Sequence, residues 1–484
     1  MQAHLLAEPP PPPAYRLYAT RWFVLFFFSL SNCNQCLSWF SFSSLDLDVM
    51  QKYFGSNMDK AAADLLLNWG PIIGAACAPL QTWMLSQPRG LRKGTWCGIL
   101  LVFFGNLLRS VPILAVTAFG AEQSFVQSSA AFYCYHGGQI LNAAAGPFLM
   151  GATSRLACVW FGEHERTTAT AIATTANAAG TTIGFLNPIW LSPTEDTIPN
   201  IFWLSLGLAA LSAAGAACYL QVAPPTPPSA AAEASPEELP EAAHATTDEG
   251  GALDAAGAAG AERPVGWLAS LRSAGGSFSF VVLVGLAAIL SGVACAWQAL
   301  FQSVLAGKGG PLKQADVGWI GFGNALAGNV AAVLSGLVMD RWLGRRLKLG
   351  IMVGLMGGGL CTGWFALQLP LLSFGRLLPR STGSLIVAVT LEGFFYGLTS
   401  PLFYELGAEL VYPVREGTSA GLLVLLLNLT SGLMIFLNNF LPATVGNLIM
   451  TVAFFACLLC IALCVREEYK RPLDQPRRPK LVNE

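Results

Sequence analysis

APPTPPSAAAEASPEELPEAAHATTDEGGALDAAGAAGAERPVG, residues 223–266, is the centre of a polar stretch that runs from about Gln221 to Gly275. It contains eight acids and few bulky apolar residues, so it cannot bury a core and we expect it to be largely disordered. About 220 residues lie before it and about 210 after it, and both flanks are strongly hydrophobic. The stretch therefore predicts two apolar halves of similar size joined by a solvated linker.

The composition of the whole chain is that of a membrane protein. Of 484 residues, 54% are hydrophobic and only 11% are charged, with a mean hydropathy of +0.54. A soluble globular protein carries roughly 25% charged residues, so the deficit indicates a surface that faces lipid. The net charge of −1 shows no basic bias, which argues against nucleic acid as a partner.

Cysteine usage and the known catalytic motifs give no sign of an enzyme. The two C-x-x-C pairs, Cys33–Cys36 and Cys457–Cys460, lie inside apolar segments, and the chain has only four histidines. We interpret the cysteines as small apolar helix residues, so no disulfide framework, metal or cofactor is expected. No nucleophile elbow, P-loop, H-E-x-x-H or dinucleotide fingerprint is present in the sequence.

Twelve segments are long and apolar enough to cross a bilayer, which takes about 20 residues each. They lie at 22–45, 63–85, 94–118, 130–160, 168–191 and 200–221, and at 277–304, 314–340, 347–369, 383–411, 417–441 and 445–465. The prediction is an all-α membrane protein with twelve transmembrane helices. It divides the chain into a tail (1–21), a six-helix half (22–221), the linker (222–275), a second six-helix half (276–465) and a second tail (466–484).

The Lys and Arg residues predict the orientation of these helices. Twenty fall on the side of the termini and linker, and seven fall on the opposite side. The seven are Lys52, Lys60, Arg109, Lys308, Lys313, Arg376 and Arg380. Positive charge favours the cytoplasmic side, so both termini and the linker are expected in the cytoplasm. The expected location is the plasma membrane or an endolysosomal membrane.

The two halves resemble each other. WFGEHERTTATAIATTANAAGTTIGF (160–185) aligns without gaps on VYPVREGTSAGLLVLLLNLTSGLMIF (411–436). In this alignment Glu165 meets Glu416 and Asn177 meets Asn428. Parallel six-helix repeats about an axis along the membrane normal are the architecture of one large class of transporters. The halves are therefore expected to be pseudo-symmetric.

The loop after the eighth segment reads GLVMDRWLGRR, residues 336–346. It resembles the major facilitator superfamily pattern G-x-x-x-D-R-x-G-R-R with one extra residue. Asp340 at a helix C-terminus needs a cationic partner or a helix N-terminus to offset the dipole. Such a contact makes Asp340, Arg341 and Arg345 a candidate conformational latch. A basic cluster that only sets topology explains the loop about equally well.

With these residues in view, the chain resembles the feline leukaemia virus subgroup C receptor family of major facilitator transporters. The likeness is carried by six stretches in both halves, closest to the disrupted-in-renal-carcinoma branch: Phe28–Trp39, Asn68–Arg92, Gly137–Pro147, Trp160–Ala173, Asp316–Phe322 and Tyr404–Gly421. The resemblance implies transport of small organic nutrients. In the family these are choline and ethanolamine, a pyridoxine-type vitamin together with protons, and, as a debated claim, haem.

Trp39 and Trp297 lie in the first helix of each half, which lines the cavity in this superfamily. An aromatic face attracts a desolvated cation by about 2 kcal/mol, and the resemblance implies that aromatics at these two positions bind choline. Packing between helices is the alternative for both.

Asn177, Gln139 and Gln298 are candidate substrate-binding amides, and interhelical hydrogen bonds are the competing role. Glu405 is the carboxylate that we expect deepest in a span. It is a candidate to take a proton or to face a cationic substrate, and a structural ion pair is equally open.

The expected function is alternating-access transport of a small organic solute, an organic cation such as choline or ethanolamine, or a pyridoxine-like vitamin. Its partners are the solute, the lipid bilayer and, as a candidate, protons. Transport of haem and a non-transporting receptor or sensor on the same fold are the alternatives. A membrane enzyme would need a reactive polar cluster that the sequence does not show.

Overall fold

The structure is a computed structural model of the chain. It describes residues 16–219 apart from 44, 88, 192 and 193, together with 224–226, 228 and 275–468 apart from 300–304, 306–311, 339–345, 370–376, 380, 412–415, 439 and 442. Nearly all of the linker and most of both tails lie outside the described residues. The expectation that the linker is disordered concerns this part of the chain and stays a prediction.

Twelve helices of 21 to 32 residues make up the described part of the chain. The first bundle contains α1 (Thr20–Phe40), α3 (Lys60–Ser86), α4 (Gly90–Phe119), α5 (Ser129–Trp160), α6 (Glu163–Gly184) and α8 (Pro199–Tyr219). The second contains α12 (Phe278–Ala299), α14 (Gln314–Val338), α15 (Leu347–Leu367), α16 (Thr382–Val411), α17 (Glu416–Asn438) and α18 (Ala443–Cys464). Each long helix coincides with one predicted span, so the all-α fold with twelve helices is confirmed.

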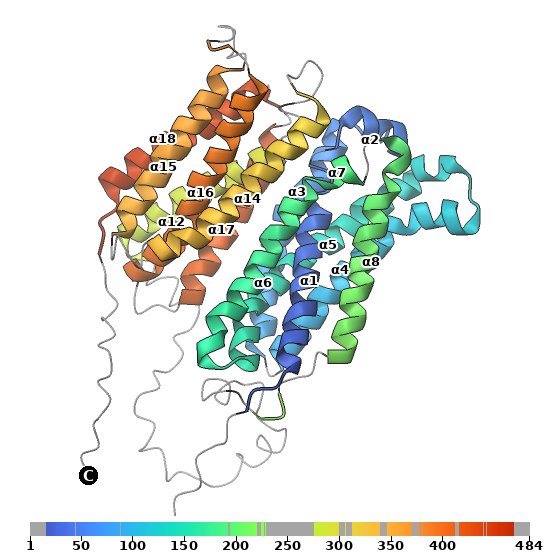
Figure 1. Cartoon of the computed structure of the whole chain (residues 1–484), viewed down its shortest axis with the longest axis horizontal. Coiled ribbons are helices and arrows are strands. Elements are labelled where there is room, and N and C mark those ends of the chain that lie inside the picture. The colour runs from blue at the N-terminus through green and yellow to red at the C-terminus, as the bar shows by residue number, and fades with distance from the viewer. Residues whose placement is uncertain are drawn as a thin grey trace, which may run out of the picture.

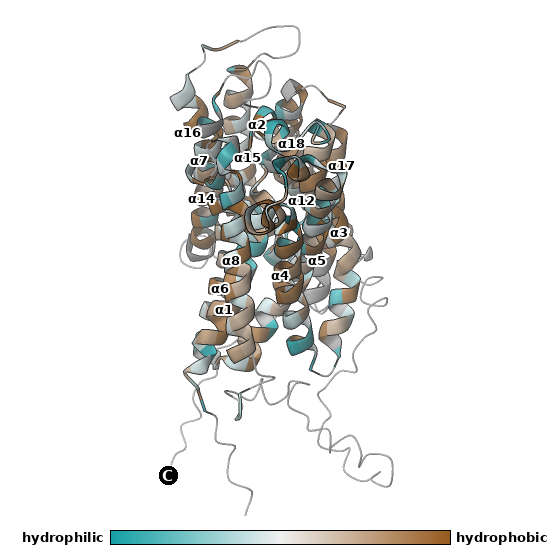
Figure 2. Ribbon diagram, turned by 90° about the vertical axis from the view of Figure 1, so that its right-hand side faces the viewer, coloured by the Kyte–Doolittle hydropathy of each residue, from teal (hydrophilic) through white to brown (hydrophobic). Residues whose placement is uncertain are grey.

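Hydrophobicity divides these helices into two groups. Eight are apolar enough to span a membrane by length and composition. Of the other four long helices in the described residues, α17 contains a shorter apolar stretch, Leu422–Leu437, while α1, α5 and α6 carry more polar side chains. Apolar side chains such as Val333, Leu360 and Leu463 are exposed on the outside of the bundles, where lipid would cover them. Figure 2 shows this predominance of hydrophobic residues along the helices.

The helices of the two bundles pack in the same pattern (Figure 1). In the first bundle α1 packs on α6 and α8, while α5 packs on α3 and α4. In the second, α12 packs on α17 and α18, while α16 packs on α14 and α15. The equivalent helix packs on the equivalent partner in each case, which confirms the predicted pseudo-symmetry of the halves.

The two halves meet towards one end, and α3 also packs on α17 as far as Gly74 and Asn428 near the middle of both helices. We call the end at which α1 begins and α18 ends the terminal end, and the opposite one the far end. At the far end Phe185 lies against Gly318 and Gly321 of α14, and the rings of Trp190 and Trp319 lie 6.1 Å apart. Figure 1 shows the bundles close together at this end and diverging towards the terminal end.

Residues along one side of α6 show where the two halves separate. Thr182 accepts a hydrogen bond from Asn329 Nδ2 of α14 at 3.1 Å. Thr175 and Thr168 lie seven and fourteen residues earlier on the same side of the helix, but they are exposed and line an open pocket. The halves are therefore joined at the far end and apart towards the terminal end.

A short helix that the sequence analysis missed covers the far end of the first half. Helix α2 (Leu47–Phe54) is capped by Asp46, which accepts a hydrogen bond from Asp48 N at 3.0 Å. It buries Phe54 between Phe202 and Tyr135, at ring-centroid distances of 6.2 and 4.8 Å. Eight amphipathic residues between two spans are too few to stand out by hydropathy.

Candidate functional site

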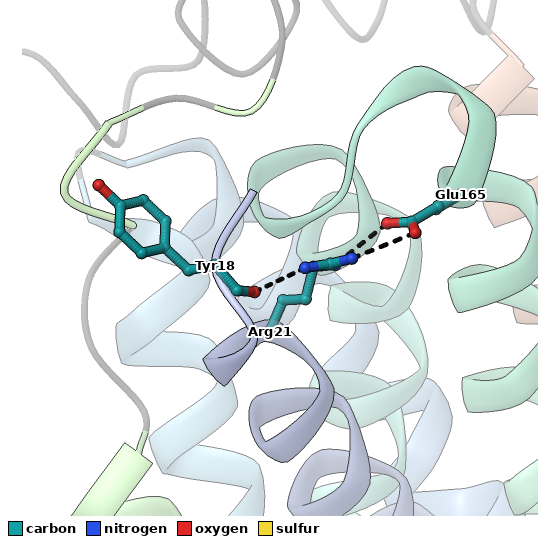
Figure 3. Close-up of polar contacts among 3 residues, drawn as sticks. All are labelled: Tyr18, Arg21 and Glu165. Carbon is teal, nitrogen blue, oxygen red and sulfur yellow. Dashed lines mark hydrogen bonds and ion pairs between the residues drawn. The ribbon is translucent and has the colours of Figure 1, made fainter. Parts of the chain in front are cut away.

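The start of α1 is tied to the start of α6 by an ion pair (Figure 3). Arg21 donates from Nε to Glu165 Oε2 at 3.0 Å and from Nη2 to Oε1 at 3.1 Å, and its Nη1 donates to Tyr18 O at 2.8 Å. The side chains of Arg21 and Glu165 are 13% and 35% exposed, so the pair stabilises the fold by about 1 kcal/mol at most. Its two-pronged geometry fixes the angle between α1 and α6 at the terminal end.

The side-chain amides of α1 form hydrogen bonds with neighbouring helices and do not line a cavity. Asn32 donates to Ala173 O of α6 at 3.0 Å, and Asn34 donates to Ser205 O of α8 at 2.9 Å. Gln35 and Asn142 of α5 each donate to the other's backbone carbonyl, at 3.2 and 3.0 Å. These amides join α1, α5, α6 and α8 into one rigid half.

Arg109 is the centre of the first half, and its position corrects the sequence analysis. We counted it among the charges on the side opposite the termini, but it lies inside α4 and is 1% exposed. It donates to Ser38 O at 3.0 Å, to Gln139 Oε1 at 2.9 Å and to Asn106 Oδ1 at 3.0 Å. Its guanidinium also lies over the rings of Phe42 and Phe202, at 5.6 and 5.2 Å. Among the described residues it has no carboxylate partner.

Gln139 is fully buried and works as a partner of Arg109. Its amide nitrogen donates to Trp39 O at 3.4 Å. The network of Arg109 therefore ends directly behind Trp39, and it holds the backbone of α1 at that point.

Trp39 lies where the first half faces the second. It is half-buried, and its indole nitrogen donates to Leu67 O of α3 at 2.8 Å. The ring packs so closely on Gly70 that no methyl group would fit there. The next residue of α3, Pro71, lies against Gly432 of α17. Because hydrogen bonding satisfies its nitrogen, Trp39 offers a partner only its aromatic faces.

Asn177 is half-buried on α6, beside the residues that line the open pocket. It donates to Asn32 Oδ1 at 2.9 Å and accepts from Cys36 Sγ at 3.1 Å. Its repeat counterpart Asn428 on α17 is also half-buried and donates to Val424 O of its own helix at 2.9 Å. The two asparagines keep their positions in the repeat but differ in their bonds.

Trp297 and Gln298 lie at the equivalent place in the second half. Trp297 is 5% exposed, donates to Asn447 Oδ1 at 2.8 Å and meets Phe365 edge to face at 5.7 Å. Gln298 is half-buried, and its side chain donates to Asn324 Oδ1 at 2.9 Å. Its backbone carbonyl accepts from Ser43 Oγ at 3.0 Å, which is a direct bond between the two halves. In this conformation each tryptophan binds within its own half.

Two of the three carboxylates of α16 have different surroundings. Glu405 is exposed, on the same side of the helix as Val387 five turns earlier, which is also exposed. Glu392 is 0% exposed and is bonded to Asn324 of α14. The sequence singles out Glu405 for its expected depth, but it does not show which side of α16 other helices cover. Asp340, Arg341 and Arg345, the candidate latch, lie outside the described residues.

Residues 27–434 match the family profile of the Major Facilitator Superfamily. Among solved structures, the inward open conformation of the xylose transporter XylE from E. coli superposes with a TM-score of 0.66 at 11% identity, over 92% of this chain and 97% of that chain. A D-xylose-proton symporter superposes with a TM-score of 0.63 at 14% identity, over 93% and 99%. Two repeated six-helix bundles joined at one end are the fold of this class. The protein is a membrane-embedded major facilitator transporter and not an enzyme.

Two relatives narrow the class. The chain is 30% identical over 485 residues to the solute carrier family 49 member 4 homolog of Xenopus tropicalis, covering 96% of this chain and 95% of that protein. It is 28% identical over 430 residues to the choline/ethanolamine transporter FLVCR1 of Felis catus, covering 86% of this chain and 67% of that protein. The chain belongs to solute carrier family 49, the feline leukaemia virus subgroup C receptor-related family, which confirms the resemblance drawn from its motifs.

Proposed function

We propose that the protein moves a small organic solute, an organic cation such as choline or ethanolamine or a pyridoxine-like vitamin, by alternating access. The observation that carries the proposal is the position of Trp39. It is half-buried, its indole nitrogen is bonded to Leu67 O, and its ring packs on Gly70, one residue before Pro71, which lies against Gly432 of the second half. A flat or ammonium-bearing solute binds an aromatic face, and relatives named as choline/ethanolamine transporters support this class.

The contacts between the halves suit a rocking motion. They are the hydrogen bonds Ser43–Gln298 and Thr182–Asn329, the packing of Phe185 on two glycines, and the packing of α3 on α17 at Gly432. Glycines let the helices close without side chains in the way. Opening the far end breaks these contacts, and the latch proposed at Asp340, Arg341 and Arg345 would then hold the terminal end closed.

The charge of Arg109 bears on the kind of solute. Its guanidinium is bonded to the carbonyl of Ser38, the residue before Trp39. A fixed positive charge disfavours a permanent cation nearby in a low-dielectric interior. A neutral hydroxylated ring escapes this repulsion, and the half-buried amides of Asn177 and Gln298 can bond its hydroxyls. Within the proposed class, this favours the vitamin over choline.

Tracer uptake into proteoliposomes tests the function. Choline, ethanolamine, pyridoxine and haem are offered singly, with empty liposomes as the control. We expect saturable uptake of at least one of the first three, with pyridoxine the strongest. Saturable binding of a tracer without any flux would show a receptor or sensor instead. Flux of haem alone would replace the proposed substrate class.

The proposed topology puts the terminal end in the cytoplasm, in the plasma membrane or an endolysosomal membrane. Because Arg109 is buried inside α4, it no longer counts as a charge of the far end. Twenty Lys and Arg residues then lie on the side of the termini and linker and six on the opposite side, so the charge bias that predicts the orientation is stronger. We expect epitope tags at the N-terminus, at residue 250 and at the C-terminus to be reached by antibodies only after the cytoplasmic side is opened. A tag stained on sealed cells would contradict the orientation.

A further inference from the structure

Glu392 is a buried carboxyl group that the transport site described above does not use. One oxygen, Oε2, accepts a hydrogen bond from Asn324 Nδ2 at 2.6 Å. The other, Oε1, is buried and has no hydrogen-bond partner among the described residues. A carboxylate in this position would be a buried charge with half of its acceptor sites empty, which is strongly unfavourable.

Among the residues that the structure describes, those around Glu392 offer no positive charge. The titratable groups within electrostatic range are the thiol of Cys361 on α15 and the phenol of Tyr396 on α16, with Cys295 of α12 beside Tyr396. All three are neutral when protonated. Helix α12 carries no charged residue, and Glu416 of α17 is in its first turn at the terminal end.

The charged residues of the other packed helices lie elsewhere. Lys348 of α15 donates its ammonium protons to Ala462 O and Val465 O at the terminal end. Asp316, in the first turn of α14, accepts from the backbone nitrogen of Lys313 at 3.3 Å. On α16 itself Glu405 and Glu409 follow Glu392 by more than three turns. Glu392 is therefore expected to hold a proton in this conformation.

A chain of hydrogen bonds connects Glu392 to the contact between the halves. Asn324 donates to Glu392 and to Val389 O, and it accepts from Gln298 Nε2 at 2.9 Å. The carbonyl of Gln298 accepts from Ser43 of the other half. Helices α14 and α16 touch backbone to backbone here, since a Cβ at Gly393 would collide with Asn324 O. A shift of Gln298 therefore acts directly on Asn324, which is the hydrogen-bond donor to Glu392.

We propose that Glu392 is a proton-binding site whose protonation favours closure of the far end. With the far end closed, Glu392 is sealed and neutral. When Ser43 leaves Gln298, water reaches the amides and Glu392 can release its proton to it. The state that binds the proton more tightly is populated as the pH falls, so acid favours the closed far end. Because the proposal rests on the proposed transport, its test uses a readout that needs no substrate.

Trp190 and Trp319 supply that readout, because their rings meet across the far end. Cysteines at both positions are treated with a bifunctional thiol reagent, and the linker is then cut with a protease. Crosslinked protein stays in one piece, and the same protein without the cysteine pair reports the background. We expect faster crosslinking at acid than at alkaline pH. In Glu392→Gln, a permanently neutral isostere, crosslinking should be fast at both.

Two further variants make the test specific. Glu405→Gln changes another carboxyl of α16 and should leave the pH dependence of crosslinking in place. Asn324→Leu removes both the donor that stabilises the ionised carboxyl and the link to Gln298, so the midpoint of the pH dependence should rise or the dependence should be lost. A pH dependence in Glu392→Gln equal to that of the unsubstituted protein overturns the proposal, as does an unmoved midpoint in Asn324→Leu.

A transport experiment then tests whether protonation of Glu392 is coupled to movement of the solute. With a transported tracer and the membrane voltage clamped, a gradient of one pH unit can drive at most about tenfold accumulation for each coupled proton. We expect Glu392→Gln to lose this stimulation and to keep exchange of the tracer. If no tracer moves in any protein while the crosslinking pattern holds, the proposed function fails and the proton site stands.

Discussion

Arg109→Ala is expected to lower the free energy of unfolding by at least about 3 kcal/mol. The substitution removes the side-chain donor of Ser38 O and of Gln139 Oε1, at about 1–3 kcal/mol each, while Asn106 Oδ1 keeps the hydrogen bond from Ser38 Oγ. It also opens a cavity beside Phe42 and Phe202 that the surrounding helices fill only in part. Most of the protein should therefore be lost to aggregation, as measured by monodisperse yield and thermal midpoint in detergent.

Arg92 is the matched control for Arg109, because it is an exposed arginine near the start of the same helix. Arg92→Ala should change the stability by no more than about 0.5 kcal/mol. Arg109→Lys keeps the charge but not the planar set of donors, so it should recover only part of the loss. Equal stability of Arg109→Ala and Arg92→Ala would contradict the structural role of Arg109.

Arg109 also shows where reasoning from the sequence stops. The twelve spans were predictable because each must supply about 20 apolar residues, whatever its neighbours are. The place of one charged residue inside a span depends on those neighbours instead. The three acceptors of Arg109 come from α1, α4 and α5, up to 71 residues away. No local sequence pattern predicts these acceptors, so Arg109 was assigned to the side opposite the termini.

The amides of α1 show the same limit of reasoning from the sequence. The sequence shows that these residues are amides, and an amide inside a span can either line a cavity or bond a neighbouring helix. The choice depends on backbone carbonyls such as Ala173 O and Ser205 O, 141 and 171 residues away. A carbonyl is present at every residue, so the sequence carries no sign of which one accepts. The structure assigns Asn32, Asn34 and Gln35 to bonds within the first half.

The carboxylates of α16 show a third limit. The helix is apolar nearly all round, so its sequence does not show which side faces another helix. Glu405 was therefore chosen for its expected depth in the span. Close contacts of Gly393 and Gly397 with α14 fix the rotation of α16. This rotation buries Glu392 and leaves Glu405 exposed, which is why the proton is assigned to Glu392.

The two tryptophans now have different expected results, although the sequence treated them as a pair. Trp297→Ala would leave Asn447 unpaired and a cavity beside Phe365, which lowers the amount of folded protein before affinity can be read. Trp297→Phe keeps an aromatic ring and loses only the bond to Asn447. It should reach the membrane and show an affinity reduced by a few-fold, because Phe has a weaker negative face.

Trp39→Ala should reach the membrane in near-normal amount and bind its solute roughly 5- to 30-fold more weakly. The loss corresponds to about 1–2 kcal/mol of contact between the solute and an aromatic face. Trp39 is only half-buried, so its removal disturbs packing less than that of Trp297. Affinity and surface abundance are measured separately for Trp39→Ala, Trp297→Phe and the double variant. If one solute touches both rings when the halves close on it, the two effects will be non-additive. Full affinity in Trp39→Ala would remove the aromatic wall from the proposed site, and with it the preference for a flat or ammonium-bearing solute.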